Sequence, residues 1–309
     1  MANSSKVYKE KRLSQKIFLL NSVIRDKSIS DNGIMVYCFL KAIQRADMNY
    51  YAFSVDIMDY FFRHTFDMDT REKKKYIDGL NDLEKHGLIR KINEKKYNFE
   101  YDLQPIYFDP SKSNKENGSL FTVVYSDELN AIMQIKDNDF TGSKIKLIRY
   151  FINVVSTFLH GREWTYELPG GSKTDGVVGF FSIETLSSIS NINKDTALIY
   201  NKILEKAKIL YIYRAKDLVL INNKLTGITN TYGRYKYKKV IIDAGKEHKS
   251  DYVIKHITKK ATERRSLGLK YYNLVFGNKM YDEKTIIDIY RYAVEYNRMH
   301  KDDYFYKDK

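Results

Sequence analysis

A long-period internal repeat constrains the fold of this 309-residue chain more than any other feature. The segment Phe53–Met58 (FSVDIM) matches Phe181–Leu186 (FSIETL) at an offset of 128. Leu83–Ile89 (LEKHGLI) matches Leu204–Leu210 (LEKAKIL) at an offset of 121. The chain is therefore expected to contain two copies of one structural unit, with the difference between the offsets absorbed in a connector.

Each copy begins with the pattern of two helices. Apolar residues at three- and four-residue steps predict a first helix over Ile34–Ile43 in one copy and Ile145–Phe158 in the other. A short second helix follows, and Ser54 or Ser182 occupies its N-cap position, where a hydroxyl can accept a hydrogen bond from a free amide of the first turn. Both copies are thus predicted to start in the same way.

A third helix is predicted over Thr70–His86 in the first copy and about Lys194–Ala207 in the second. Gly87 follows the first of these helices at the place where a left-handed residue commonly ends a helix. The same element is therefore expected third in both copies.

The periodicity then changes from helical to alternating, which indicates a β-hairpin. The first predicted hairpin joins Leu88–Ile92 to Tyr97–Tyr101, and the second joins Leu210–Tyr213 to Leu218–Ile221. Three helices followed by a hairpin is the element order of a winged helix, in which the hairpin is the wing.

The expected fold class is α+β and mainly helical, with tandem winged-helix domains followed by a basic helical segment. Two of the three prolines lie in a polar stretch after residue 104 and mark a linker. The predicted divisions are a first winged helix, a linker, a second winged helix and a C-terminal segment, over residues 1–104, 105–119, 120–224 and 225–309. Helices are predicted in the last segment over Ile254–Arg265, Leu267–Val275 and Lys284–Met299.

The charge balance favours a polyanionic partner. The chain has 53 Lys and Arg against 39 Asp and Glu, a formal net charge of +14, and residues 225–309 hold +8 of it. Nucleic acid is preferred over a membrane surface, because the basic helices lack a strongly apolar opposite face. No apolar run approaches the roughly 18 residues needed to cross a bilayer. The single cysteine, Cys38, lies in an apolar run and fits a buried thiol in a reducing cytoplasm.

In a winged helix that binds duplex DNA, the third helix enters the major groove while the wing touches the backbone. In the first copy, basic side chains crowd the start of the third helix and the wing. These candidate DNA-binding residues are Arg71, Lys73, Lys74, Lys75, Lys91, Lys95 and Lys96. The alternative is that these lysines form an ordinary solvated face.

The second copy offers a sparser set, and it is expected to bind DNA, to dimerise, or to do both. Its candidates are Lys194, Thr196, Tyr200, Lys202, Arg214 and Lys216. A further stretch interleaves basic and aromatic residues, which suits phosphate contacts and base stacking, although it also fits an edge strand with tyrosines on one face. Its candidates are Arg234, Lys236, Lys238 and Lys239.

Sequence patterns of catalysis are missing from the chain. The six histidines show no HxH or HExxH spacing, and no cysteine pair supports a zinc site. The stretch Leu168–Thr174 lacks the glycines of a phosphate-binding loop at the required positions and is interpreted as an inserted surface loop. We therefore expect no enzymatic activity, no metal and no cofactor.

Two segments carry a resemblance to a known group of proteins. Phe18–Ser30 resembles the segment leading into the first helix of winged-helix replication initiators and replisome organisers from plasmids and phages of low-GC Gram-positive bacteria. Lys75–Ile92 (KYIDGLNDLEKHGLIRKI) looks like their recognition helix and the start of their wing. The likeness covers roughly residues 17–102, and tandem winged helices in one chain are similar to the arrangement in plasmid Rep initiators.

The resemblance implies a sequence-specific protein that binds repeated origin sequences in double-stranded DNA and recruits host replication proteins, such as a helicase loader or a polymerase subunit. Two alternatives remain open. One is a transcriptional repressor of the same genetic element, and the other is an adaptor that docks replication proteins. A homodimer is compatible with all three.

Overall fold

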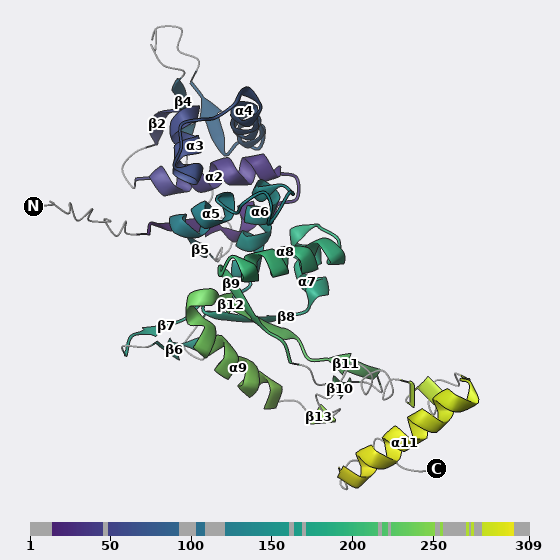
Figure 1. Ribbon diagram of the computed structural model, residues 1–309. Helices are drawn as coiled ribbons and strands as arrows, with labels where there is room; N and C mark the ends of the chain where they lie inside the picture. Colours follow the sequence, from purple (N-terminus) through teal and green to yellow (C-terminus); the bar gives the residue numbers. More distant parts are fainter. Residues whose placement is uncertain are drawn as a thin grey trace, which may run out of the picture.

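The structure is a computed structural model of a mixed α/β chain, mainly helical with small antiparallel sheets (Figure 1). The residues that it describes are 14–45, 49–92, 103–108, 121–160, 164–168, 171–215, 218–221, 224–250, 254–255, 270–271, 273–274 and 280–299.

The first unit contains one three-stranded sheet with helices against it. The sheet is antiparallel in the order β2-β4-β3, so the last strand lies in the centre. The elements in chain order are β1 (Lys16–Leu20), α1 (Asn21–Ile24), α2 (Asp31–Ile43), β2 (Tyr50–Ser54), α3 (Val55–Arg63), α4 (Thr70–Lys85), β3 (Ile89–Lys91) and β4 (Leu103–Phe108).

The second unit repeats this plan, with an antiparallel sheet in the equivalent order β8-β12-β9. Its elements are β5 (Phe121–Tyr125), α5 (Ser126–Met133), α6 (Lys144–Val155), β8 (Val178–Phe181), α7 (Ile183–Ser190), α8 (Lys194–Lys206), β9 (Leu210–Tyr213) and β12 (Asn230–Arg234). The inserted loop predicted between its helices carries a small hairpin of β6 (Tyr166–Glu167) and β7 (Lys173–Thr174).

The repeat seen in the sequence corresponds to matching helix ends. The Ser54 hydroxyl accepts a hydrogen bond from the Ile57 amide at 3.2 Å, and the Ser182 hydroxyl accepts one from the Thr185 amide at 3.1 Å. Both predicted N-caps are thus confirmed. Gly87 has the expected left-handed conformation after α4, with φ +67°, and Lys208 adopts the same conformation after α8, with φ +56°.

The second predicted hairpin was wrong in its pairing, and the first can be followed only in its first strand. In the first unit, β3 pairs with β4, so the sheet runs past the predicted boundary at residue 104. The predicted partner Tyr97–Tyr101 lies outside the described residues. In the second unit, β9 pairs with β12, whereas β10 (Leu218–Ile221) pairs with β11 (Lys224–Gly227). The alternating pattern located the strands, but it could not show which of several strands would pair.

The C-terminal predictions are corrected in part. Residues 230–234, assigned to the basic segment, supply the central strand of the second sheet as β12. They lead through a 3₁₀ turn, η3 (Tyr235–Tyr237), into α9 (Lys238–Ser250). Ile254 and Lys255 were predicted to start a helix but form β13, which pairs with β10. The last predicted helix is confirmed as α11 (Glu283–Met299).

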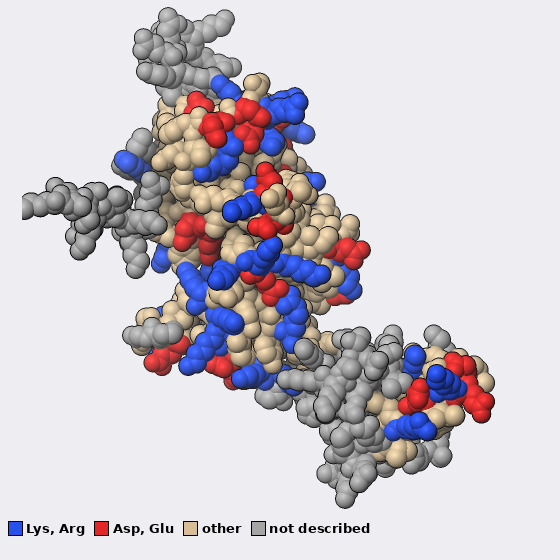
Figure 2. Space-filling model, viewed as in Figure 1, with Lys and Arg blue, Asp and Glu red and all other residues tan. Residues whose placement is uncertain are grey.

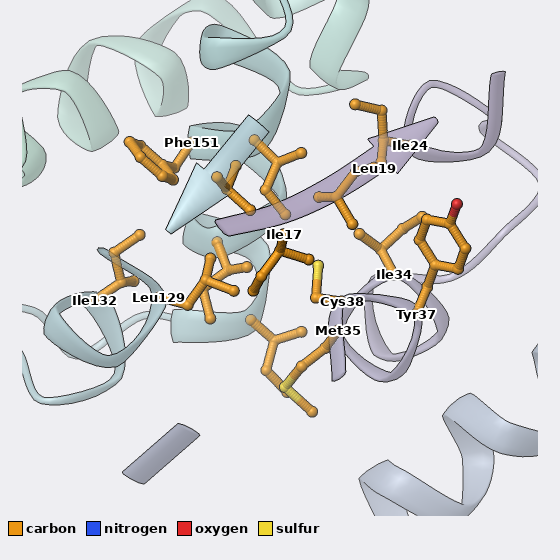
Figure 3. Packing of buried hydrophobic residues seen from close by; sticks show 14 of the residues in the cluster. Ile17, Leu19, Ile24, Ile34, Met35, Tyr37, Cys38, Leu129, Ile132 and Phe151 are labelled. Atoms are coloured by element: carbon orange, nitrogen blue, oxygen red, sulfur yellow. The ribbon is translucent and has the colours of Figure 1, made fainter. Parts of the chain in front are cut away.

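The two units share one hydrophobic core. β1 of the first unit pairs antiparallel with β5 of the second, with Lys16 opposite Tyr125 and Leu20 opposite Phe121. Figure 3 shows Ile17 and Leu19 of β1 packed among residues of α2, α5 and α6. Cys38 is fully buried there, as predicted, and burial raises the pKa of its thiol. The units are therefore joined by packing as well as by the chain between them.

Arginine side chains add polar contacts across this junction. Arg149 of α6 donates to the carbonyl oxygens of Asp26 and Ile29, each at 2.7 Å, and to the Asp31 carboxylate at 3.1 Å. Arg25 donates to the carbonyl oxygen of Ser156 at 2.7 Å. Guanidinium groups with several backbone acceptors fix the relative orientation of the units more firmly than apolar contact alone.

Candidate nucleic-acid interface

The helix α4 is held against the first unit by one apolar side. Tyr76, Leu80 and Leu83 are buried. Gly79 allows α4 to cross α2 closely, because a Cβ atom at this position would lie 2.6 Å from the carbonyl oxygen of Asn32. The packing therefore determines which side of α4 faces outward.

The outward side of α4 carries most of the candidates predicted for this helix. Arg71, Lys74 and Lys75 are exposed, whereas Lys73 is half-buried. The same side continues through three residues that were not among the candidates: Asp78, Asn81 and Lys85. The face is thus basic at its start and carries groups able to donate and to accept hydrogen bonds along its length.

A buried polar network fixes the N-terminal half of α4. Arg63 of α3 donates to the Asp59 carboxylate at 2.8 Å and forms an ion pair with Glu72 at 2.8 Å. The Tyr76 hydroxyl donates to Asp59 at 2.9 Å, and burial raises the pKa of Tyr76. The hydrogen bond to Asp59 raises the pKa of Arg63. The network borders a cavity of about 560 Å³ that Lys75 lines from the first unit and Lys144 from the second.

The predicted wing of the first unit contributes less than expected within the described residues. The Lys91 ammonium donates to the Asn81 side chain and lies 3.8 Å from the Glu84 carboxylate, so intramolecular partners hold it against α4. Lys95 and Lys96 lie outside the described residues. Arg90, which was not a candidate, is exposed on β3.

In the second unit, the turn before the third helix is tight. α7 ends at Ser190, and the left-handed Asn191, with φ +51°, starts a three-residue connection to α8. The Asn193 side chain caps α8 by accepting from the Thr196 amide at 2.7 Å. The corresponding connection in the first unit runs from His64 to Asp69. The second unit therefore has the tighter helix–turn–helix connection of the two.

The outward side of α8 mixes basic and apolar side chains. Lys194 and Lys202 are exposed, and Thr196 is half-buried. Between them, Leu198 is 42% exposed and Ile199 is 52% exposed. Apolar groups on a third helix can contact thymine methyl groups or a protein partner, so this face is chemically different from that of α4.

One candidate on α8 was wrong. Tyr200 was predicted to face DNA, but it is only 7% exposed and packs edge-on against Tyr150 and Phe140. The next residue, Asn201, is also buried, and it accepts from the Tyr150 hydroxyl at 2.8 Å. In the repeat, Asn201 corresponds to Leu80 of α4, which is also buried. The position therefore faces the core in both units, although one side chain is an amide and the other is apolar.

Two further basic candidates of the second unit have intramolecular partners. Arg214 forms a two-pronged ion pair with Glu205 at 2.6 and 2.9 Å, and this hydrogen bonding raises the pKa of Arg214. Lys194 contacts the Glu184 carboxylate. The candidate Lys216 lies outside the described residues. Among the basic candidates on α8 and just after β9 that the structure describes, Lys202 is exposed and forms no ion pair.

Arg234 was predicted to contact phosphates, and this is wrong. Its side chain is buried, forms an ion pair with Glu128 at 2.5 Å and donates to the carbonyl oxygen of Val123 at 2.5 Å. It thus ties the end of β12 to β5 and α5. The edge-strand alternative for residues 234–239 is also wrong, because β12 is central and the following residues are helical.

The remaining candidates of this stretch lie on the surface at the start of α9. Lys236, Lys238 and Lys239 are exposed. The Lys236 ammonium lies 4.2 Å from the centre of the Tyr125 ring, and the Lys238 ammonium lies 5.1 Å from that of Tyr211. Basic and aromatic side chains therefore do lie next to one another here. The aromatic rings come from β5 and β9 as well as from residues 234–239.

The charge is unevenly spread over the face shown in Figure 2. Red and blue groups mix over α3 and α4, whereas blue predominates lower down, around β9 and α9. Within the described residues, no three His, Cys, Asp or Glu side chains are grouped so that they could hold a metal ion. No helix in the described part of the chain is long and apolar enough to cross a membrane. No known protein family and no curated protein matches this sequence.

Proposed function

We propose that this chain is a tandem winged-helix protein that binds double-stranded DNA sequence-specifically and initiates replication of a plasmid or phage. The observation that carries the proposal is the repetition of one plan. Each unit places its last strand between the other two strands of its sheet and has a third helix, α4 or α8, with an outward side carrying basic residues. In a winged helix, this side of the third helix lies in the major groove.

The two helices would make different kinds of contact with the duplex. Arg71, Lys74 and Lys75 on α4 would contact phosphates and set the position of the protein on the duplex. On α8, Lys202 would contact the backbone, while Leu198 and Ile199 would pack against thymine methyl groups. Specificity therefore depends more on α8, and salt-sensitive affinity depends more on α4.

The first experiment is footprinting of the full chain on DNA flanking its gene, followed by titration of the protected site and a scrambled duplex. Specific binding is expected to weaken with salt along a log–log slope of about −5 if roughly six phosphates are neutralised. Equal affinity for the site and the scrambled duplex at physiological salt would refute the proposal. Several repeated protected sites support an initiator, whereas one site overlapping the promoter supports a repressor.

A pair of charge-reversal variants tests the assigned face. Lys74→Glu with Lys75→Glu should weaken binding at least tenfold and reduce the salt slope by about 2 or more, because two phosphate contacts become repulsive. The matched control is Lys173→Glu with Lys246→Glu, which changes the net charge equally on exposed residues of β7 and α9. Equal weakening by both pairs would show that net charge, rather than the α4 face, governs binding.

One observation favours a second function for the second unit. The apolar pair Leu198 and Ile199 is exposed on α8, which also suits contact with a replication protein. In such an adaptor, Leu198→Asn would abolish capture of a helicase loader or polymerase subunit but leave duplex binding unchanged. A change in DNA sequence preference by this variant would instead assign the pair to base recognition.

A further inference from the structure

The two-stranded sheet of β1 and β5 presents one face away from the shared core. Ile17, Leu19 and Val124 point inward and are buried. The alternate residues point outward, with Phe18 opposite Val123 and Lys16 opposite Tyr125. The Phe18 ring is 50% exposed and that of Phe121 is 46% exposed. The outward face therefore carries Phe18 in its middle, Phe121 opposite the buried Leu20 at one end, and Lys16 with Tyr125 at the other end.

The residues after β12 extend this face. Lys236 and Tyr237 of η3 reach the basic end of the sheet, where the Lys236 ammonium lies 4.2 Å from the Tyr125 ring centre and 5.1 Å from that of Tyr237. A cavity of about 190 Å³ opens at this junction and is lined by Lys16, Phe18, Tyr125 and Tyr237 among others. We call this surface the β1–β5 platform, and it comprises Lys16, Phe18, Phe121, Tyr125, Lys236 and Tyr237.

Two acidic groups near the β1–β5 platform have partners within the chain. Glu128 is held by Arg234, and Asp175 lies 3.3 Å from the His160 ring nitrogen at the cavity wall. Lys238 continues the basic edge, stacked over Tyr211. The surface therefore offers positive charge next to rings and suits a polyanion that also presents flat apolar groups.

We propose that the β1–β5 platform binds single-stranded nucleic acid, with bases stacked on Phe18 and Tyr237 and phosphates held by Lys16 and Lys236. The Tyr125 ring lies between these groups and already holds the Lys236 ammonium at 4.2 Å and the Arg234 guanidinium at 5.1 Å. Duplex DNA buries its base faces and could use only the lysines, whereas an unpaired strand uses both kinds of group. Stacking tolerates any base, so little sequence preference is expected.

This inference does not depend on the proposed duplex binding, because it uses none of the residues on α4 or α8. The test uses fluorescence anisotropy of the full chain with labelled oligothymidylate and oligouridylate of about 12 nucleotides, a length within the usual site sizes. Tighter binding of the deoxy probe identifies single-stranded DNA as the ligand, and tighter binding of the ribo probe identifies RNA. Failure to bind either probe at low salt overturns the proposal.

Variants assign the binding to the platform. Phe18→Thr and Lys236→Gln should each weaken oligonucleotide binding about fivefold or more, since one lost stack or phosphate contact has at least this effect. The matched control is Tyr50→Thr, which removes another exposed strand aromatic, on β2. Unchanged affinity in both platform variants, or an equal loss in the control, overturns the assignment.

Two further measurements distinguish the platform from the duplex-binding face and from a contact between copies of this chain. Lys74→Glu with Lys75→Glu should leave oligonucleotide binding within about twofold of the wild type, because these residues belong to the duplex-binding face. Light scattering of Phe18→Thr should show the same oligomeric state as the wild type. A loss of oligomerisation in that variant would make the platform an interface between copies and would overturn the proposal.

Discussion

The close packing of α4 against α2 depends on the lack of a Cβ atom at Gly79. Gly79→Ala is therefore the most direct test of that packing. A Cβ atom there would lie 2.6 Å from the carbonyl oxygen of Asn32 and 2.7 Å from Cγ2 of Val36, whereas ordinary contact begins at 3.4 Å. The helices α2 and α4 would have to separate by about 0.8 Å, since the Asn32 backbone cannot rotate away.

Two opposing effects set the sign of the change in stability. Alanine is preferred over glycine inside a helix by about 1 kcal/mol, and overpacking of a tight contact costs about 1–3 kcal/mol, more when the contacted atoms are backbone. We therefore expect Gly79→Ala to lower the free energy of unfolding by about 1–2 kcal/mol. The control is Asp78→Ala, an exposed neighbour on α4, which should change stability by less than about 0.5 kcal/mol.

Urea denaturation followed by circular dichroism measures both variants. The loss should appear as a lower midpoint with an unchanged slope, because one methyl group hardly changes the surface that unfolding exposes. A Gly79→Ala protein as stable as the wild type, or more stable, would show that α2 and α4 do not cross this closely. Duplex binding by this variant should weaken too, because α4 would be displaced from its position.

Contacts elsewhere in the chain give three more expected outcomes. Arg234→Met should cost about 3 kcal/mol, because it leaves the part-buried Glu128 carboxylate without its cation. The double variant with Glu128→Leu should recover part of the loss in the same denaturation assay. Hydrogen bonds from Ser28 lower the pKa of Asp26, so the ionised carboxylate stabilises the folded protein at pH values above the unfolded pKa of about 3.9, and this stabilisation is lost as the pH falls through the lower folded pKa. Asp26→Asn should therefore make the free energy of unfolding less dependent on pH in that acid range. The same pH dependence in the variant and the wild type would contradict this. The buried Cys38, whose pKa is raised, should react with a thiol reagent only as the chain unfolds, and rapid labelling of the native protein would refute its burial.

The helices were predictable because their signals are local. Serine caps, a glycine after α4 and apolar steps of three and four residues each act within one or two turns, and the bounds of α2, α4 and α8 agree with those signals to within a few residues. The repeat supplied a second instance of each element, which strengthened the equivalence of α4 and α8.

Strand pairing was predicted poorly because it depends on distant residues. β9 pairs with β12, and the hairpin of β10 and β11 lies between them in the sequence. Nothing in Leu210–Tyr213 indicates that β12 rather than β10 is the neighbour of β9. The pairing of β1 with β5 joins residues more than 100 positions apart and left no mark in the local pattern. The shared core was missed for the same reason.

Predictions of site residues failed where a polar or charged side chain was taken as a sign of exposure. Arg234 and Tyr200 both belong to stretches that look like binding surfaces, yet each is buried with a partner that the sequence places far away, Glu128 and Tyr150. The exposed pair Leu198 and Ile199 was missed because apolar residues at helical spacing are normally core.

Because the two units share one core, a destabilising substitution in one unit should also affect the unfolding of the other. Trp164, the one tryptophan in the sequence, lies in the second unit with its ring 5.8 Å from that of Phe180, so its fluorescence reports on that unit. Gly79 lies in the first unit. Because β1, α2 and α6 pack in one cluster and Arg149 bridges the junction, the units should unfold together. Gly79→Ala should therefore shift the Trp164 transition to the same lower urea concentration as the circular dichroism transition. A Trp164 midpoint left at the wild-type value would show that the units unfold separately, and α4 and α8 would then belong to independently folding modules.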